Sequence, residues 1–308
     1  MKCSVIISTF NRADSLDRCL ASFHAVSGDL GGAWELLVVD NACTDPTREV
    51  CERHARALPL RCIGEPRPGK SCALNSAIPL ARADLLLLTD DDVTITAAWL
   101  REMIAAAEAH PEATHFGGPV IPQWDTPPPA WVSENLELLG GVVTYYDRGR
   151  KSEVFTRHTK PFFGANLGLR ASAMRERGIR FSEELGIIGT QRIGGEEQSV
   201  QAQLIATGGA GCYVPDAVVH HWTDSARATE SYVRHWFHQF GRLEAKLGEI
   251  PLEHAWAGVP RYLVRQFITH SLGYAITRAL LPSRRWLTHE ARAAQALGSI
   301  RELLESNR

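Results

Sequence analysis

The chain has 308 residues, of which 44% are hydrophobic and 22% charged, and its formal net charge is −2. These values are typical of a globular protein that can bury a sizeable core, as one large domain or as a domain with an appendage. The near-neutral total excludes a basic surface over the whole chain, so we expect no nucleic-acid partner. The charge is unevenly placed, because residues 224–308 carry 12 Lys and Arg against 8 Asp and Glu.

Seven cysteines are present, an odd number, and none of them forms a C-x-x-C pair. This usage favours reduced thiols in a cytosolic protein. The chain begins with an apolar strand pattern and shows no signal-peptide pattern. Apolar runs such as 85–88 are far shorter than the ~20 residues that a membrane-spanning helix needs. We therefore expect a cytoplasmic protein without an integral membrane segment.

The first half of the sequence alternates short apolar runs with segments of helical periodicity. Such alternation favours a parallel α/β sheet, and wholly apolar strands fit a sheet that is covered on both faces. The expected strands are 4–8, 35–39, 60–63 and 85–88, and the expected helices are 14–23, 47–57 and 71–81.

The alternation weakens after residue 119. A Pro-rich loop at 121–129 precedes short strands expected within 140–150, and a glycine-interrupted strand is expected at 162–169. Beyond residue 225 the pattern is almost entirely helical and includes an amphipathic helix over 259–281.

The stretch 64–71, GEPRPGKS, fits the phosphate-binding pattern G-x-x-x-x-G-K-[ST] between a predicted strand and a predicted helix. A P-loop holds phosphates with successive backbone N–H groups, and Pro66 and Pro68 have none to offer. We therefore expect a lysine-bearing loop beside a nucleotide and keep a P-loop NTPase or kinase as an alternative.

Polar residues follow three of the predicted strands, at Asn11 and Arg12, at Asp40, and at the acidic triplet 90–92. In an open parallel sheet, ligands bind beyond the carboxyl ends of the strands, so these residues are expected along one crevice. Three adjacent acids repel one another unless a cation neutralises them, and carboxylate oxygens suit Mg²⁺ or Mn²⁺. For Asp40 the alternative is that it caps the following turn.

Seven motifs, in order over residues 3–223, make the chain resemble glycosyltransferase family 2. They are SVIISTFNR, ELLVVDNACTD, GKSCALNSAI, LLLLTDDDV, FFGANLGLR, GGEEQSV and CYVPDAVVHHW. The resemblance implies an α/β fold of the GT-A type, with a mostly parallel Rossmann-like sheet flanked by helices. Residues 1–223 would form the nucleotide-sugar-binding and catalytic domain, and residues 224–308 a helical C-terminal extension.

The resemblance also implies an inverting transfer of a sugar from a UDP- or dTDP-type donor to an acceptor hydroxyl, dependent on Mn²⁺ or Mg²⁺. The metal ligands would be Asp90, Asp92 and His221, with His220 as the alternative to His221. Asn166 would contact the sugar or the acceptor, or serve only as a turn residue. The residues expected at the donor nucleotide are Thr9, Phe10, Arg12, Asp40, Lys70, Asp90 and Asp91.

Glu197 matches the position usually assigned to the catalytic base of the family, and Glu196 is the alternative. Glu stands where Asp is commonest, and its extra methylene matters because a displacement of ~1 Å can cost ~10²-fold in rate. The bland alternative is that the two acids only complement a helix N-terminus. A second departure is Leu74, where many relatives carry Arg.

The tail allows several interpretations. The helix over 259–281 carries Arg261, Arg265 and Arg278 beside its apolar stripe. Such a helix packs on its own domain or on a second subunit as a homodimer, or it lies on the inner face of an anionic membrane as a peripheral contact. The expected partners are the donor and a glycan, lipid-linked or small-molecule acceptor. A non-catalytic nucleotide-sugar-binding scaffold is a further alternative.

Overall fold

The computed structural model describes residues 1–26, 32–157, 160–188 and 191–306. The chain forms two compact units, one of residues 1–123 and 146–222 and one of residues 124–145 and 223–308. The division at 222 lies beside the expected one at 223, but residues 124–145 group with the helical tail. The reason is that Val132, Leu139 and Val142 pack in one apolar cluster with Val233 and Leu287 of the tail.

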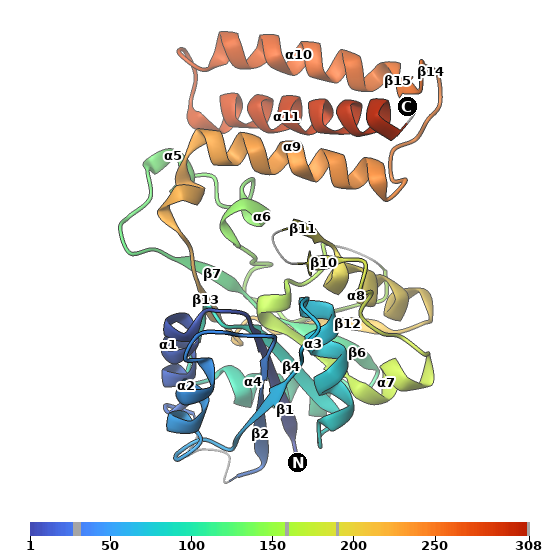
Figure 1. Ribbon diagram of the computed structural model, residues 1–308. Coiled ribbons are helices and arrows are strands. Elements are labelled where there is room, and N and C mark those ends of the chain that lie inside the picture. The colour runs from blue at the N-terminus through green and yellow to red at the C-terminus, as the bar shows by residue number, and fades with distance from the viewer. Residues whose placement is uncertain (27–31, 158–159, 189–190, 307–308) are drawn as a thin grey trace. The chain divides into compact units, whose positions relative to one another are not determined.

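The first unit contains an eight-stranded sheet in the order β3-β2-β1-β4-β9-β6-β12-β8, with helices on both of its faces (Figure 1). β1 lies parallel to β2 and β4, and β2 lies parallel to β3. β9 is antiparallel to both of its neighbours, and β8 is antiparallel to β12. The predicted α/β class with a mostly parallel sheet is therefore confirmed. The strands are β1 (Cys3–Thr9), β2 (Trp34–Asp40), β3 (Leu60–Gly64), β4 (Leu85–Asp90), β6 (Ala113–Gly117), β8 (Glu153–Phe155), β9 (Leu167–Arg170) and β12 (Ala210–Tyr213).

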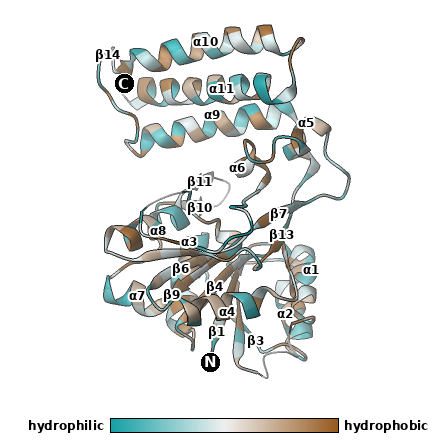
Figure 2. Cartoon of the chain, turned by 180° about the vertical axis from the view of Figure 1, so that it is seen from behind, coloured by the Kyte–Doolittle hydropathy of each residue, from teal (hydrophilic) through white to brown (hydrophobic). Residues whose placement is uncertain are grey.

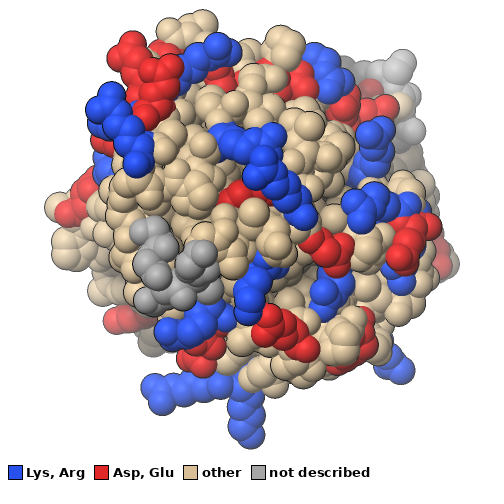
Figure 3. Space-filling model, turned by 90° about the horizontal axis from the view of Figure 1, so that it is seen from below, with Lys and Arg blue, Asp and Glu red and all other residues tan. Residues whose placement is uncertain are grey.

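The helices of this unit follow the expected alternation. The predicted helix over 71–81 ends early, because Pro79 lacks an N–H and turns the last residues into the 3₁₀ segment η1 (Ile78–Leu80). The helices are α1 (Ala13–Phe23), α2 (Thr47–His54), α3 (Lys70–Ala77), α4 (Trp99–Ala109), α7 (Ala171–Glu176) and α8 (Glu196–Ala206). On the face shown in Figure 3, basic and acidic side chains are interspersed.

Burial accounts for the apolar strand patterns. Every residue of β2 is buried, as are the first five residues of β1 and of β4, so the centre of the sheet is covered on both faces. A second, three-stranded sheet has the order β5-β13-β7, from β5 (Val93–Ile95), β13 (Val219–Trp222) and β7 (Val120–Gln123). Two further strands, β10 (Gly186–Ile188) and β11 (Gln191–Gly194), pair in antiparallel orientation.

Two segments differ from the sequence-based expectation. The strands predicted within 140–150 are wrong: the segment contains helix α6 (Gly140–Val143), and only Tyr146 forms a bridge, with Val120. The predicted strand over 162–169 begins instead as the 3₁₀ turn η2 (Gly164–Asn166) and becomes extended only in β9. In both segments glycines allow the backbone to leave an extended path.

The second unit is helical. Helix α11 (Ser283–Ser306) lies between α9 (Glu230–Lys246) and α10 (Arg261–Thr277) (Figure 1). A hairpin of β14 (Ala255–Trp256) and β15 (Val259–Pro260) precedes α10, so the helix predicted over 259–281 begins two residues late. The short elements are α5 (Ala130–Ser133) and η3 (Ser225–Ala228).

Helices α9 and α11 approach each other closely at two glycines. A Cβ on Gly241 would overlap the carbonyl oxygen of Gln295, and a Cβ on Gly298 would overlap the carbonyl oxygen of His238. The hydroxyl of Ser299 donates to the carbonyl oxygen of Gly241, 3.0 Å away. The absence of side chains at these two positions therefore sets the distance between the helices.

We predict that Gly241→Ala destabilises the helical unit by about 1–3 kcal/mol, because the new methyl group overpacks the α9–α11 contact. The sign of this change in stability is informative, because alanine in an exposed helix is normally favoured over glycine by ~1 kcal/mol. The measurement is the free energy of unfolding from urea denaturation followed by circular dichroism, with Thr269→Ala on exposed α10 surface as control. A Gly241→Ala protein as stable as the native one contradicts the close packing.

Candidate functional site

The carboxyl ends of three strands bring the expected site residues together. Thr9, the last residue of β1, pairs in register with Asp40 at the end of β2, and Ser8 pairs with Asp90 at the end of β4. The parallel register therefore places the polar termini side by side at one edge of the sheet, as the sequence predicted.

His221 reaches this edge through the second sheet. β13 runs antiparallel to β5 with His221 opposite Val93, and the Trp222 N–H donates to the Asp92 carbonyl oxygen at 2.8 Å. The Nε2 atom of His221 lies 3.2 Å from Oδ1 of Asp92. Asp90, Asp92 and His221 each offer one ligand atom, all within 4.8 Å of one another. His220 is opposite Thr94 instead, and side chains alternate along a strand, so the register favours His221 over His220.

Within the acidic triplet, Arg12 contacts Asp91 and Asp92, and Thr9 contacts Asp91. Nη1 of Arg12 lies 2.8 Å from Oδ1 of Asp91 and 2.9 Å from Oδ2 of Asp92, and the Thr9 hydroxyl donates to Asp91 at 2.7 Å. Burial raises the pKa of Asp91 to about 6, although Arg12 opposes this shift. Burial also raises the pKa of Asp92, but His221 and Arg12 outweigh it and hold that pKa below its usual value.

Lys70, the first residue of α3, connects the acidic triplet to the glutamate pair. Its Nζ lies 2.6 Å from Oδ1 of Asp90 and 2.9 Å from Oε1 of Glu197. Burial favours the neutral amine, but the charges of Asp90 and Glu197 outweigh it and raise the pKa of Lys70 well above its usual value. The ammonium group is therefore fixed between two carboxylates from segments far apart in the sequence.

The two glutamates at the start of α8 differ in protonation. Burial and the charge of Glu197 raise the pKa of Glu196 to about 7. Burial also raises the pKa of Glu197, but the nearby Lys70 outweighs it and holds that pKa below its usual value. Oε2 of Glu196 is buried and has no hydrogen-bond partner among the described residues. Glu197 is thus the ionised carboxylate of the pair at neutral pH.

Gly164 determines where the Glu197 carboxylate can lie. A Cβ at residue 164 would overlap Oε1 of Glu197, so only glycine allows this approach. This approach of Glu197 to Gly164 was not predicted from the sequence. The glycine in FFGANLGLR indicates that something lies close to the backbone there, but residue spacing does not reveal which side chain it is.

The loop that imitates a P-loop uses its N–H groups internally. The Gly69 N–H donates to Oδ1 of Asn41 at 2.8 Å, and the Arg67 N–H donates to Oε1 of Glu65 at 2.9 Å. Pro66 and Pro68 have no N–H. The structure therefore gives no support to a P-loop, and the loop presents Lys70 instead of a row of N–H groups.

Asp40 is buried and makes two interactions within the chain. Oδ1 accepts from the Cys43 N–H at 2.9 Å, and Oδ2 lies 2.7 Å from Nε of Arg48. Burial raises the pKa of Asp40, but these partners outweigh it and hold the pKa below its usual value. The turn-capping alternative thus describes an observed contact, while the nucleotide role of Asp40 stays a prediction.

Two other predicted residues have contrasting positions. Phe10 follows β1 and is 47% exposed, so its ring is accessible to a ligand. Asn166 is wholly buried: its Oδ1 accepts from Nε1 of Trp99, and its amide nitrogen donates to the carbonyl oxygens of Pro119 and Ala217. The structure therefore does not support a contact of Asn166 with sugar or acceptor. It favours the alternative, a turn residue that anchors η2.

The acidic cluster lies at the carboxyl ends of the strands of an open α/β sheet, which is where such sheets bind their ligands. Residues 4–178, more than half of the chain, match the family described as "Glycosyl transferase family 2". The chain belongs to this family.

The chain is also similar to curated proteins in sequence and to solved structures in fold. The succinoglycan biosynthesis protein ExoM of Rhizobium meliloti is 24% identical over 229 residues, which cover 74% of this chain and 69% of ExoM. The glucosyl-dolichyl phosphate glucuronosyltransferase of Haloferax volcanii is 24% identical over 227 residues, 72% of this chain and 69% of the relative. The mannosyltransferase PcManGT of Pyrobaculum calidifontis, in complex with GDP-Man and Mn²⁺, superposes with a TM-score of 0.63 at 17% identity over 99% of this chain and 87% of that one. S. aureus TarS, in complex with UDP-GlcNAc, gives 0.57 at 18% identity over 99% and 91%. These likenesses confirm the GT-A fold.

Among the described residues, no helix is long and apolar enough to cross a bilayer.

We predict that Lys70→Met lowers the free energy of unfolding by about 3–5 kcal/mol, because Asp90 and Glu197 would remain charged without their shared cation. Addition of Mn²⁺ is expected to raise the melting temperature of the variant more than that of the native protein. The measurement is thermal unfolding with and without Mn²⁺.

The matched control is Lys2→Met, which removes a surface lysine 3.1 Å from Glu108. Both partners of that pair are mostly exposed, so its loss is expected to cost only ~0–1 kcal/mol. Equal effects of the two substitutions contradict the role assigned to Lys70.

Proposed function

We propose that this protein transfers a sugar from a nucleotide-diphosphate sugar to an acceptor hydroxyl, with inversion at the anomeric carbon. The proposal rests on one observation: Lys70 lies between two sets of acidic side chains. On one side lie Asp90, Asp92 and His221, and on the other lies the single ionised carboxylate of Glu197. An ionised carboxylate that lies apart from the metal-type cluster fits the role of a base in a single displacement from the face opposite the leaving group.

The three clustered residues fit a divalent cation. Two carboxylate oxygens and one imidazole nitrogen within 4.8 Å form a donor set that suits Mn²⁺ or Mg²⁺. When bound there, the cation would stabilise the negative charge of the departing diphosphate as a Lewis acid. The Mn²⁺ in the PcManGT complex supports this assignment.

The protein's own groups bind the donor and position it. We assign Thr9, Phe10, Arg12, Asp40 and Asp91 to the nucleotide side, where Phe10 offers an accessible ring and Asp91 fixes Arg12. When the donor binds, Lys70 would contact diphosphate oxygens in place of one of its two carboxylate partners. Leu74 is buried and supplies no charge. The neighbours bind GDP-Man and UDP-GlcNAc, which supports a nucleotide-sugar donor, and we propose a UDP- or dTDP-type base.

Glu197 is proposed as the general base that accepts the proton of the acceptor hydroxyl. Lys70 keeps its carboxylate ionised, and Gly164 leaves room for the longer side chain that replaces Asp. Glu196 is less suited, since a pKa of about 7 leaves much of it protonated at neutral pH. An ionised, positioned base favours an enzyme over a non-catalytic scaffold.

The acceptor class follows from the names of the relatives. One is named for succinoglycan biosynthesis and the other for transfer to a glucosyl-dolichyl phosphate. We propose a glycan or a lipid-linked saccharide as acceptor, with a small molecule as the alternative, and a location in the cytoplasm or on the inner face of the membrane.

We predict that Mn²⁺ together with the correct nucleoside diphosphate raises the melting temperature by mass action, and that Asp92→Ala abolishes this joint shift and sugar transfer. The measurement is a thermal-shift panel of UDP, dTDP and GDP and their sugars, with Mn²⁺ or EDTA. Asp216→Ala, an exposed acid of the same unit, is the control. Full transfer in EDTA contradicts the metal assignment.

We predict that Glu197→Gln slows transfer by at least ~10²-fold, the usual scale of general-base loss, while nucleoside diphosphate affinity stays near that of the native enzyme. Glu196→Gln is the matched comparison and is expected to retain most activity, because glutamine resembles the protonated acid. Rates come from initial velocities, and the product anomer from NMR. A reversed order of the two variants assigns the base to Glu196, and a product of retained configuration contradicts inversion.

A further inference from the structure

Helix α10 is apolar on two opposite sides. Its inner side faces α11, where Leu263 and Thr277 are buried and the ring of Tyr274 lies 6.2 Å from that of Trp286. Its outer side and the turn that follows it carry five large apolar residues that we name the outer stripe. They are Val264, Ile268, Leu272, Ile276 and Leu280, with exposed fractions of 42%, 52%, 60%, 64% and 76%.

The outer stripe is a continuous feature of the helix surface. Its members on α10 are four residues apart, so each lies beside the next, and they extend ~18 Å along the helix. Leu280 follows in the turn after the helix. α11 covers the opposite side of α10, and Figure 2 shows hydrophobic residues recurring along α10. A helix that is apolar all round is normally buried, and an exposed patch of this kind marks an interaction surface.

The surroundings of the outer stripe are basic. No Asp or Glu occurs between Glu253 and Glu290, whereas arginines occur at 261, 265, 278, 284 and 285. Arg278 pairs with Glu230 and lies over the Trp286 ring. The other four arginines are exposed and have no ion pair within the described part of the chain.

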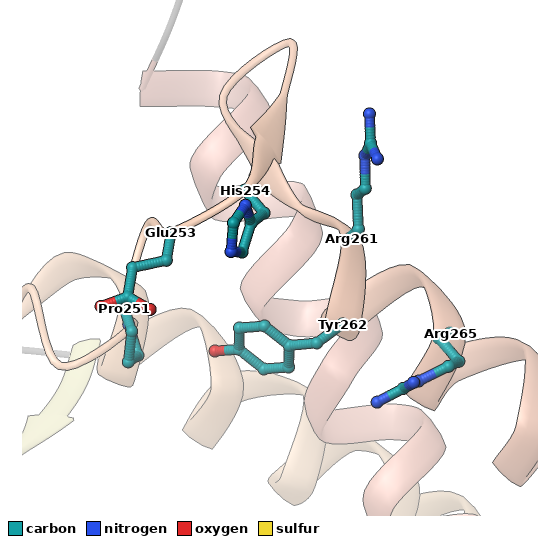
Figure 4. A pocket seen from close by; sticks show the side chains of 6 residues that line it. All are labelled: Pro251, Glu253, His254, Arg261, Tyr262 and Arg265. Atoms are coloured by element: carbon teal, nitrogen blue, oxygen red, sulfur yellow. The ribbon is translucent and has the colours of Figure 1, made fainter.

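The hairpin before α10 adds an exposed aromatic side chain. Trp256, in β14, is 78% exposed. A cavity of about 290 Å³ lies where the hairpin meets α10, lined by Pro251, Glu253, His254, Arg261, Tyr262 and Arg265 (Figure 4). Tryptophan and arginine at the edge of an apolar surface are the residue types that favour the interface between lipid headgroups and acyl chains.

We propose that α10 and the β14–β15 hairpin lie on an anionic phospholipid surface, with the outer stripe buried in the acyl boundary and the four unpaired arginines at the headgroups. Charge complementarity favours a lipid surface over a second copy of the protein as the partner of the outer stripe. A second copy of α10, in either direction, would bring arginines against arginines, whereas acidic headgroups neutralise them. The contact would hold the protein at a membrane surface.

The experiment is flotation of the full-length protein with vesicles in the absence of substrates. Vesicles of phosphatidylcholine with phosphatidylglycerol are expected to carry the protein, and vesicles of phosphatidylcholine alone are not. Ile268→Glu with Leu272→Glu is expected to lower the bound fraction at least ~10-fold, because two apolar side chains no longer enter the bilayer. Arg261→Gln with Arg265→Gln is expected to weaken binding to the anionic vesicles, and added salt to weaken it further.

The control is Val154→Glu, an exposed apolar residue of β8 in the other unit, which is expected to bind as the native protein does. Circular dichroism and melting temperatures establish that each variant is folded. Equal binding to neutral vesicles, or unchanged binding of the Ile268→Glu, Leu272→Glu variant, overturns the proposal. So does a dimer in light scattering that the same double variant dissociates, since a second copy would then cover the stripe. If the protein transfers sugar but does not float with the vesicles, the membrane contact is refuted and the proposed function stands.

Discussion

The site depends on the balance of charge between the end of β4 and the start of α8, which Lys70 connects. Five carboxylates gather there, and buried carboxylates are costly unless each is compensated. Arg12 compensates Asp91 and Asp92, while Lys70 compensates Asp90 and Glu197. Arg12 follows β1 and Lys70 opens α3, so these two cations connect otherwise separate βα units into one arrangement. The same arrangement lowers the pKa of Glu197, while burial and the charge of Glu197 raise the pKa of Glu196 to about 7.

This balance also explains how a stable fold can be ready for catalysis. Asp90 and Asp92, which would hold a divalent cation, are paired with Lys70 and Arg12, so they need not repel one another. In the proposed reaction Lys70 would exchange a carboxylate for the donor diphosphate, which replaces one charge pair by another. Gly164 leaves room for the Glu197 carboxylate, because a larger residue would occupy its position.

The helical unit combines close packing with an open face. Gly241 and Gly298 allow α9 and α11 to approach until backbone atoms touch. α10 packs on α11 with one apolar side and leaves the outer stripe uncovered. Apolar surface on a protein that stays in solution is a liability unless it has an occupant. The proposed lipid contact gives the stripe a role consistent with its basic surroundings.

The sequence by itself determined the features that depend on neighbouring residues. Strands β1 to β4, the acidic triplet and the glutamate pair were predictable because apolar runs and strand-end acids are local patterns. Tertiary structure decided the rest. The β5–β13 register placed His221 beside Asp92, and Lys70 contacts Glu197, which is 127 residues away in the sequence. Asn166 proved to be buried among backbone carbonyls, and residues 124–145 joined the helical unit. Such contacts arise from strand pairing and packing between distant segments, and residue spacing carries no record of which distant segments will meet.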